Sequence, residues 1–289
     1  MSTSVLFDAP GPKARRRHLI LTILSALVLA GLVYVALSRL QERGELEAAK
    51  WTAMFTRQSW EFYFIPGIIS TLRSAAVAVV LALVFGFVFG MGRLSQHRAV
   101  RWVSGIVVEF FRGVPVLIMM IAFFYFLALR GVFAPETNPF VAVVAALTLY
   151  NGAVIAELVR SGVGSLPAGQ GEAGLSIGLT PGQTLRAIQL PQAITAMLPA
   201  LVGQLVVILK DSALGAIITY PELLRQARNL AAGGNTLQPL VVAALIFIVL
   251  NFSLTTFAGY LERRINRRGK VAGGAAPVDE AGPQPAGGV

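Results

Sequence analysis

The chain has 289 residues, of which 55% are hydrophobic and 13% are charged, and its formal net charge is +10. An average soluble protein has about a quarter of its residues charged, so this composition favours a membrane protein. The absence of cysteine excludes a disulfide framework and a thiolate metal site. His18 and His97 lie beside arginines at the ends of apolar runs, and the sequence predicts no metal site.

The apolar runs predict six transmembrane helices, because a helix needs about 20 predominantly apolar residues to cross a bilayer. A polar segment at 1–18 precedes a charge-free run at 19–38, followed by a mixed-charge linker at 39–65. The run at 19–38 exceeds the apolar core of a secretory signal, so we expect an uncleaved first span. A cleaved signal is the alternative, because Ala36-Leu37-Ser38 loosely resembles a cleavage site.

The remaining spans are expected at about 68–92, 103–127, 139–157, 193–218 and 239–261. A polar loop is expected at 220–238. The tail at 263–289 begins with basic residues, and we expect it to be disordered from Val271 because glycine, alanine and proline dominate there.

The lysines and arginines predict how these helices are oriented in the membrane. With both termini in the cytoplasm, fourteen basic residues lie in cytoplasmic segments and seven in outer segments, which also contain six acidic residues. The sequence therefore predicts cytoplasmic termini and a cytoplasmic loop at 158–192. Orientation explains the positive charge, and we expect no nucleic-acid partner.

Two short helices are predicted inside this cytoplasmic loop. The first is expected from about Pro167 to Ile177 and to stop at Gly178, which can adopt the left-handed conformation that ends a helix.

The second loop helix begins with a capping box. Thr180 is its N-cap, Pro181 its first residue, and Gln183 follows three residues after the cap. We expect it to end near Gln189, because Pro191 disfavours helical geometry at the residue before it. A capped helix–turn–helix between two spans indicates a rigid surface.

The loop also contains a spaced motif of one acidic residue with small and apolar residues: Glu172, Ala173, Gly174, Gly178, Ile188, Leu190 and Pro191. This spacing resembles the EAA loop of ABC importer permeases, EAA-x3-G-x9-I-x-LP, with Gly174 in place of the family's second alanine. The neighbouring stretches AELVR at 156–160, PAGQ at 167–170, LPQA at 190–193 and KDS at 210–212 resemble the polar amino-acid permeases, the histidine/glutamate/glutamine group.

The resemblance implies an all-α type I permease of a bacterial inner membrane, with one peripheral N-terminal helix, a five-helix core within 66–262 and a cytoplasmic coupling loop. It implies that Glu172 engages a groove of an ABC ATPase dimer. A second permease chain, identical or homologous, and an extracytoplasmic amino-acid-binding protein would complete the assembly. The implied cargo is a polar amino acid of the glutamate, aspartate and glutamine group, moved by alternating access.

The sequence contains no phosphate-binding loop, so we expect this chain to hydrolyse no ATP and to hold no cofactor. ATP and Mg²⁺ would belong to the partner ATPase. Three other classes remain open: an ion-gradient-driven secondary transporter, an intramembrane enzyme, and a receptor or scaffold. An enzyme would need a nucleophile–base or metal cluster, and the sequence predicts none.

Charged residues inside the spans are functional candidates, because each costs roughly 2.5–3.5 kcal/mol at a helix centre. Glu109 with Arg112, and Glu157 with Arg160, are three residues apart on one helical face and are expected to form structural ion pairs.

Lys210 and Asp211 lie well inside the fifth span, and Gly203 and Gln204 precede them by seven residues on the same faces. We therefore name Lys210, Asp211 and Gln204 as candidates for the translocation path. Pairing with groups on neighbouring helices is the alternative.

Overall fold

The computed structural model describes residues 11–272, and for 261–263 and 265–272 it describes the backbone alone. The described residues contain helices and no strand, which confirms the all-α prediction. Five of the described helices are long and apolar enough to cross a membrane, and a sixth crossing results if the bent pair α5–α6 is one span. Because the described residues begin at 11, the first part of the predicted segment at 1–18 lies outside them.

The helices in chain order are α1 (Pro12–Glu42), α2 (Ala48–Thr52), α3 (Arg57–Ser59), α4 (Ile65–Arg93), α5 (Arg98–Gly113), α6 (Val116–Arg130), α7 (Asn138–Gly164), α8 (Ala168–Ser176), α9 (Pro181–Thr184), α10 (Leu190–Asp211), α11 (Leu223–Ala231) and α12 (Leu237–Ala272). Between them lie the 3-10 segments η2 (Ala53–Phe55) and η5 (Ser212–Ile218) and the π-helical turns η3 (Trp60–Phe64) and η4 (Leu185–Gln189).

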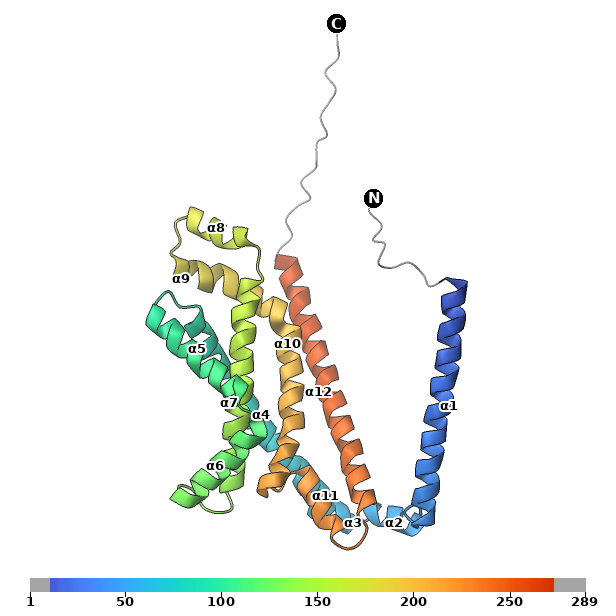
Figure 1. Cartoon of the computed structure of the whole chain (residues 1–289). Helices are drawn as coiled ribbons and strands as arrows, with labels where there is room; N and C mark the ends of the chain where they lie inside the picture. Colours follow the sequence, from blue (N-terminus) through green and yellow to red (C-terminus); the bar gives the residue numbers. More distant parts are fainter. Residues whose placement is uncertain (1–10, 273–289) are drawn as a thin grey trace.

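The first predicted span lies within α1, which also includes the basic residues that precede the apolar run. No residue of α1 is buried, and Figure 1 shows this helix standing apart from the others. The linker predicted at 39–65 is mostly helical, since α2, η2, α3 and η3 lie within it and η3 continues into α4.

Helix α7 is at the centre of the core and packs against α4, α5, α6 and α10. Its apolar side chains are buried on most sides, and α4 approaches it closely because glycines face it. A Cβ at Gly90 would lie 2.8 Å from the Cβ of Val159, so the two backbones can approach only because position 90 has no side chain.

The third span is predicted at 103–127, and the structure divides this stretch between two helices. Helices α5 and α6 meet at a 97° bend. Val114, between them, is extended (φ −88°, ψ 125°), because the ring of Pro115 disfavours helical geometry at the preceding residue.

Two other predicted boundaries also change. The fourth span is longer than 139–157, because α7 continues to Gly164, and α12 continues to Ala272, through the first part of the predicted tail. Val271 and Ala272, for which disorder is predicted, therefore end a helix, and the rest of that tail lies outside the described residues.

The predicted polar loop at 220–238 contains the amphipathic helix α11. Its buried residues Leu223, Ala227 and Ala231 are spaced four apart and form one face of this helix, which packs against α4 and α12. The Tyr220 hydroxyl donates to the Ser70 carbonyl at 2.7 Å, and the Leu223 amide donates to the Thr71 hydroxyl at 3.1 Å. These bonds fix the start of α11 on α4.

Candidate functional site

The loop between α7 and α10 begins with α8, whose end is determined by Gly178. This glycine has a φ of +86°, in the left-handed region predicted for it. Its amide donates to the Leu175 carbonyl at 3.0 Å, and the Leu179 amide donates to the Gly174 carbonyl at 3.1 Å. This pair of bonds satisfies the last carbonyls of the helix, and the predicted stop is confirmed.

Helix α9 begins with the predicted capping box. The Gln183 amide donates to the Thr180 hydroxyl at 3.4 Å, and the Thr180 amide donates to the Gln183 side-chain carbonyl at 2.8 Å. The predicted end near Gln189 is wrong, because the helical backbone continues through η4 into α10. In η4 the Leu190 amide bonds to the Leu185 carbonyl, five residues back. Pro191 is the second residue of α10 and follows this π-helical turn directly.

Gly174 fixes how α8 lies on α9. It is the buried residue of α8, and a Cβ there would lie 2.5 Å from Thr184 Cγ2 and 3.1 Å from Ile188 Cδ1. The Gln192 side-chain Nε2 also donates to the Gln170 side-chain carbonyl at 2.9 Å, which joins α10 to α8. The two loop helices therefore form one rigid unit at one end of the molecule (Figure 1).

The motif residues divide between the interior and the surface of this unit. Glu172, Ala173, Gly178 and Pro191 are exposed, whereas Gly174 is buried and Ile188 and Leu190 are half-buried. Leu190 packs against the main core cluster.

Two large apolar side chains lie exposed close to Glu172 in the chain: Leu175 is 50% and Ile177 is 75% exposed. A carboxylate with apolar residues and a small alanine next to it can contact a basic side chain while the apolar groups exclude water from that contact.

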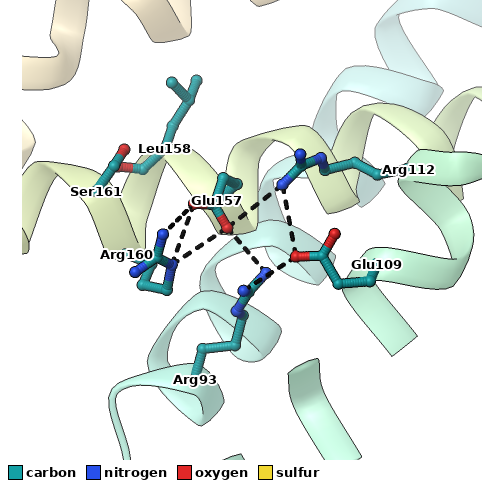
Figure 2. A network of polar contacts seen from close by, with 7 residues as sticks. All are labelled: Arg93, Glu109, Arg112, Glu157, Leu158, Arg160 and Ser161. Atoms are coloured by element: carbon teal, nitrogen blue, oxygen red, sulfur yellow. Dashed lines mark hydrogen bonds and ion pairs between the residues drawn. The ribbon is translucent and has the colours of Figure 1, made fainter. Parts of the chain in front are cut away.

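A network of five charged side chains joins α4, α5 and α7 (Figure 2). Both predicted ion pairs are present: Arg112 lies 3.7 Å from Glu109, and Arg160 bonds to Glu157 through its Nε at 3.1 Å. Arg93 connects the two pairs, since Nη1 lies 2.8 Å from Glu157 Oε2 and Nη2 lies 3.1 Å from Glu109 Oε1.

Sequence reasoning missed Arg93, which is placed in a basic turn and assigned only to orientation. Its side chain is 14% exposed, and it holds carboxylates from two different helices in one planar guanidinium. The available signal was its position at the end of a predicted span that the charge distribution assigns to the cytoplasm, the same end as the two acid–base pairs.

Comparison with known proteins places this geometry in a family. The model for the "binding-protein-dependent transport system inner membrane component" matches residues 82–267, more than half of the chain. The chain belongs to this family. It is therefore the permease subunit of an ABC importer.

Individual relatives agree with this assignment. The permease is 47% identical over 227 residues to the glutamate transport system permease protein GluD of Corynebacterium glutamicum, covering 78% of this chain and 83% of that one. It is 32% identical over 205 residues to the arginine transport system permease protein ArtQ of Bacillus subtilis, covering 70% and 92%. A chain in the crystal structure of an amino acid ABC transporter with histidines is 31% identical, with a TM-score of 0.64 and coverage of 70% and 93%.

The three residues predicted for the translocation path of this permease differ in their contacts within the described residues: Gln204 is bonded to another helix, and Lys210 and Asp211 are not. Gln204 donates to the side-chain carbonyl of Asn151 at 2.5 Å, and Asn151 is fully buried and donates to the Leu147 carbonyl at 2.9 Å. Gln204 thus connects α10 to α7. Asn151 was missed, because a single amide in an apolar run indicates little on its own.

Lys210 and Asp211 lie where α10 changes to the 3-10 segment η5. Lys210 is exposed and Asp211 is half-buried. Among the described residues, neither side chain has a hydrogen bond or ion pair to another helix, so the pairing expected as the alternative is absent from this part of the chain.

A buried carboxylate, also missed, lies at the start of α11. Glu222 is fully buried and accepts from the Leu224 amide at 2.8 Å and the Arg225 amide at 2.6 Å, so it is the N-cap of that helix. Burial raises the pKa of Glu222 to about 7, although the two amides oppose the increase. The sequence signal was an acidic residue before a run with four-residue apolar spacing.

Proposed function

We propose that the permease imports polar amino acids of the glutamate, aspartate and glutamine group. An extracytoplasmic binding protein delivers the cargo, and a cytoplasmic ATPase dimer drives its translocation. Two permease chains, identical or homologous, form the pathway in the inner membrane, with both termini in the cytoplasm. ATP and Mg²⁺ are bound by the ATPase subunits.

The observation that carries this proposal is the rigid α8–α9 unit with Glu172 exposed on it. A docking element can transmit force only if it does not deform, and Gly174, the capping box at Thr180 and the Gln170–Gln192 bond all oppose deformation. Because α9 continues through η4 into α10, a displacement of the docked unit would be passed directly to a membrane-spanning helix.

The proposed cycle follows from this connection. ATP binding closes the two ATPase subunits, and their closure draws the two α8–α9 units of the permease pair together. The attached helices then tilt, and the pathway opens toward the loaded binding protein. Hydrolysis of ATP separates the subunits and returns the pathway to its inward-open state.

Glutamate as the first cargo to test is supported by the 47% identity to a permease named for glutamate transport. The relative named for arginine transport is 32% identical, so a basic amino acid is the second candidate.

The test is uptake of labelled glutamate, aspartate, glutamine and arginine by cells with and without this chain. We expect the chain to increase uptake of the acidic and amide amino acids, and ATP depletion to abolish that increase. Uptake that survives ATP depletion but is lost when the ion gradients collapse would assign the chain to secondary transport and overturn the proposal.

A further inference from the structure

We propose that a basic cavity beside α5 binds the phosphate headgroup of an anionic membrane lipid. The cavity has a volume of about 880 Å³ and lies between α5 and the ends of α4 and α7. Arg93, Arg98, Arg101 and Arg160 line it, with Glu109 as the acidic residue of the lining. The proposal is independent of which amino acid the permease carries.

The arginines of this region are more numerous than the carboxylates that pair with them. Glu109 and Glu157 are shared among Arg93, Arg112 and Arg160. With Arg98 and Arg101, five arginines face two carboxylates, which leaves an excess of three positive charges. An anion in the cavity would reduce this repulsion.

Two of the lining arginines have donors available for that anion. Within the described part of the chain, the Arg98 side chain has neither a hydrogen bond nor an ion pair, and the Arg101 side chain has a single bond from Nη1 to the Ser95 carbonyl at 2.9 Å. A guanidinium presents five N–H donors in a plane and binds phosphate oxygens in pairs. Arg98 and Arg101 can therefore hold a phosphate while Arg93 and Arg160 stay paired to their glutamates.

The position of the cavity favours a lipid over a soluble anion. Arg93 ends the spanning helix α4, and Arg160 lies in the last turns of α7, so the cavity is at the boundary of the apolar region. Basic pockets between helices at such boundaries bind anionic headgroups.

Apolar groups line the same cavity. Trp102 is 70% and Ile106 is 48% exposed, and both contribute to the lining. Tryptophan is enriched at the headgroup level of membranes. A ligand with an anionic head and an apolar body fits arginines and Trp102 together, whereas free phosphate would use the arginines alone.

The experiment titrates purified permease in neutral detergent with short-chain phosphatidylglycerol, short-chain phosphatidylcholine and glycerol phosphate, and counts bound molecules by native mass spectrometry. We expect phosphatidylglycerol to bind at least about tenfold more tightly than either of the other two. The double variant Arg98→Gln/Arg101→Gln should lose this preference, because both free guanidinium groups are removed. The matched control, Arg225→Gln/Arg228→Gln on α11, should keep it.

Equal binding of phosphatidylglycerol by the Arg98/Arg101 double variant would overturn the proposal. Binding of glycerol phosphate as tightly as phosphatidylglycerol would also overturn it, and would assign the cavity to a soluble phosphate. If Trp102→Ala separates a permease pair and leaves lipid binding unchanged, the surface around Trp102 is a contact between permease chains and not a lipid site. Uptake and ATPase retention are measured separately, so failure here leaves the proposed transport function intact.

Discussion

Gly174 of α8 and Thr184 of α9 pack so closely that a Cβ at position 174 would lie 2.5 Å from Thr184 Cγ2 and 2.8 Å from its hydroxyl oxygen. Real Cβ atoms do not approach other atoms this closely, so alanine requires Thr184 or the two helices to shift. The close fit of α8 on α9 depends on this one missing side chain.

Gly174→Ala should therefore loosen the α8–α9 unit, at a cost of about 1–3 kcal/mol for overpacking. We expect weaker retention of the ATPase in a pull-down, with the permease still inserted. Gly169→Ala on the same helix is the control, because a Cβ there meets no atom within 4 Å. The pair Gly174→Ala/Thr184→Ala should recover retention. Full retention by Gly174→Ala alone would show that this fit is not needed for docking.

Arg93→Met removes the cation shared by Glu109 and Glu157. We expect it to lower the free energy of unfolding by about 1–3 kcal/mol, since hydrogen-bonded charges are lost from a mostly buried position. Arg93→Lys should recover only part of this, because an ammonium lacks the planar fork that reaches both carboxylates.

Thermal unfolding in detergent measures this effect, with Arg112→Met as the comparison. Arg112 lies farther from the same carboxylates, at 3.4 and 3.7 Å, so its loss should cost less. A larger cost for Arg112→Met than for Arg93→Met would contradict the role given to Arg93.

Glu222 predicts a pH dependence of stability outside the spanning helices. Its pKa is raised from 4.5 to about 7 by burial, so between these values the folded chain binds more protons than the unfolded chain. The contribution of this group to stability therefore falls as the pH rises from about 4.5 to 7, and changes no further above that window. The full change is on the order of 3 kcal/mol.

Unfolding temperatures of the wild type and Glu222→Gln, measured from pH 4.5 to 8, test this prediction. The unfolding temperature of the wild type should fall relative to that of Glu222→Gln as the pH rises to 7. Parallel curves across the window would contradict the raised pKa.

Capping residues and long apolar runs are local signals, and the elements that depend on them can be predicted from the sequence. The stop at Gly178 and the box at Thr180 are confirmed because residues a few positions away determine both. The bend at Pro115 is also a local signal, but proline is tolerated inside many membrane helices when neighbours compensate. The choice between a kink and two helices is therefore made by packing against α7.

Contacts between distant segments were beyond sequence reasoning. The predicted membrane end of Arg93 matches that of Glu157, but this placement does not specify that the guanidinium reaches that carboxylate. Nothing near Gln204 indicates its contact with Asn151. Helix α11 was missed for another reason: its polar residues outweigh the few apolar positions that face α4 and α12.

Lys210 and Asp211 lead to a prediction that separates two roles. Because neither has a partner on another helix of the described chain, we expect them to face the pathway, where an amino acid brings one carboxylate and one ammonium group. At matched membrane levels, Lys210→Met and Asp211→Asn should raise the half-saturation constant for uptake or change cargo preference. If both variants lose assembly, and the complexes that still form keep the cargo preference of the wild type, Lys210 and Asp211 have a structural role.

The exposed carboxylate of Glu172 tests the central claim most directly. The measurement is ATP hydrolysis by the reconstituted permease–ATPase complex, with and without cargo-loaded binding protein. Glu172→Ala should lower the stimulated rate by about tenfold or more, since a charge-assisted contact is worth about 1.5–3 kcal/mol. Glu136→Ala, in the loop between α6 and α7, should behave as the wild type. Full stimulation of the Glu172 variant, with normal retention of the ATPase, would contradict the account of α8–α9 as a coupling surface centred on this residue.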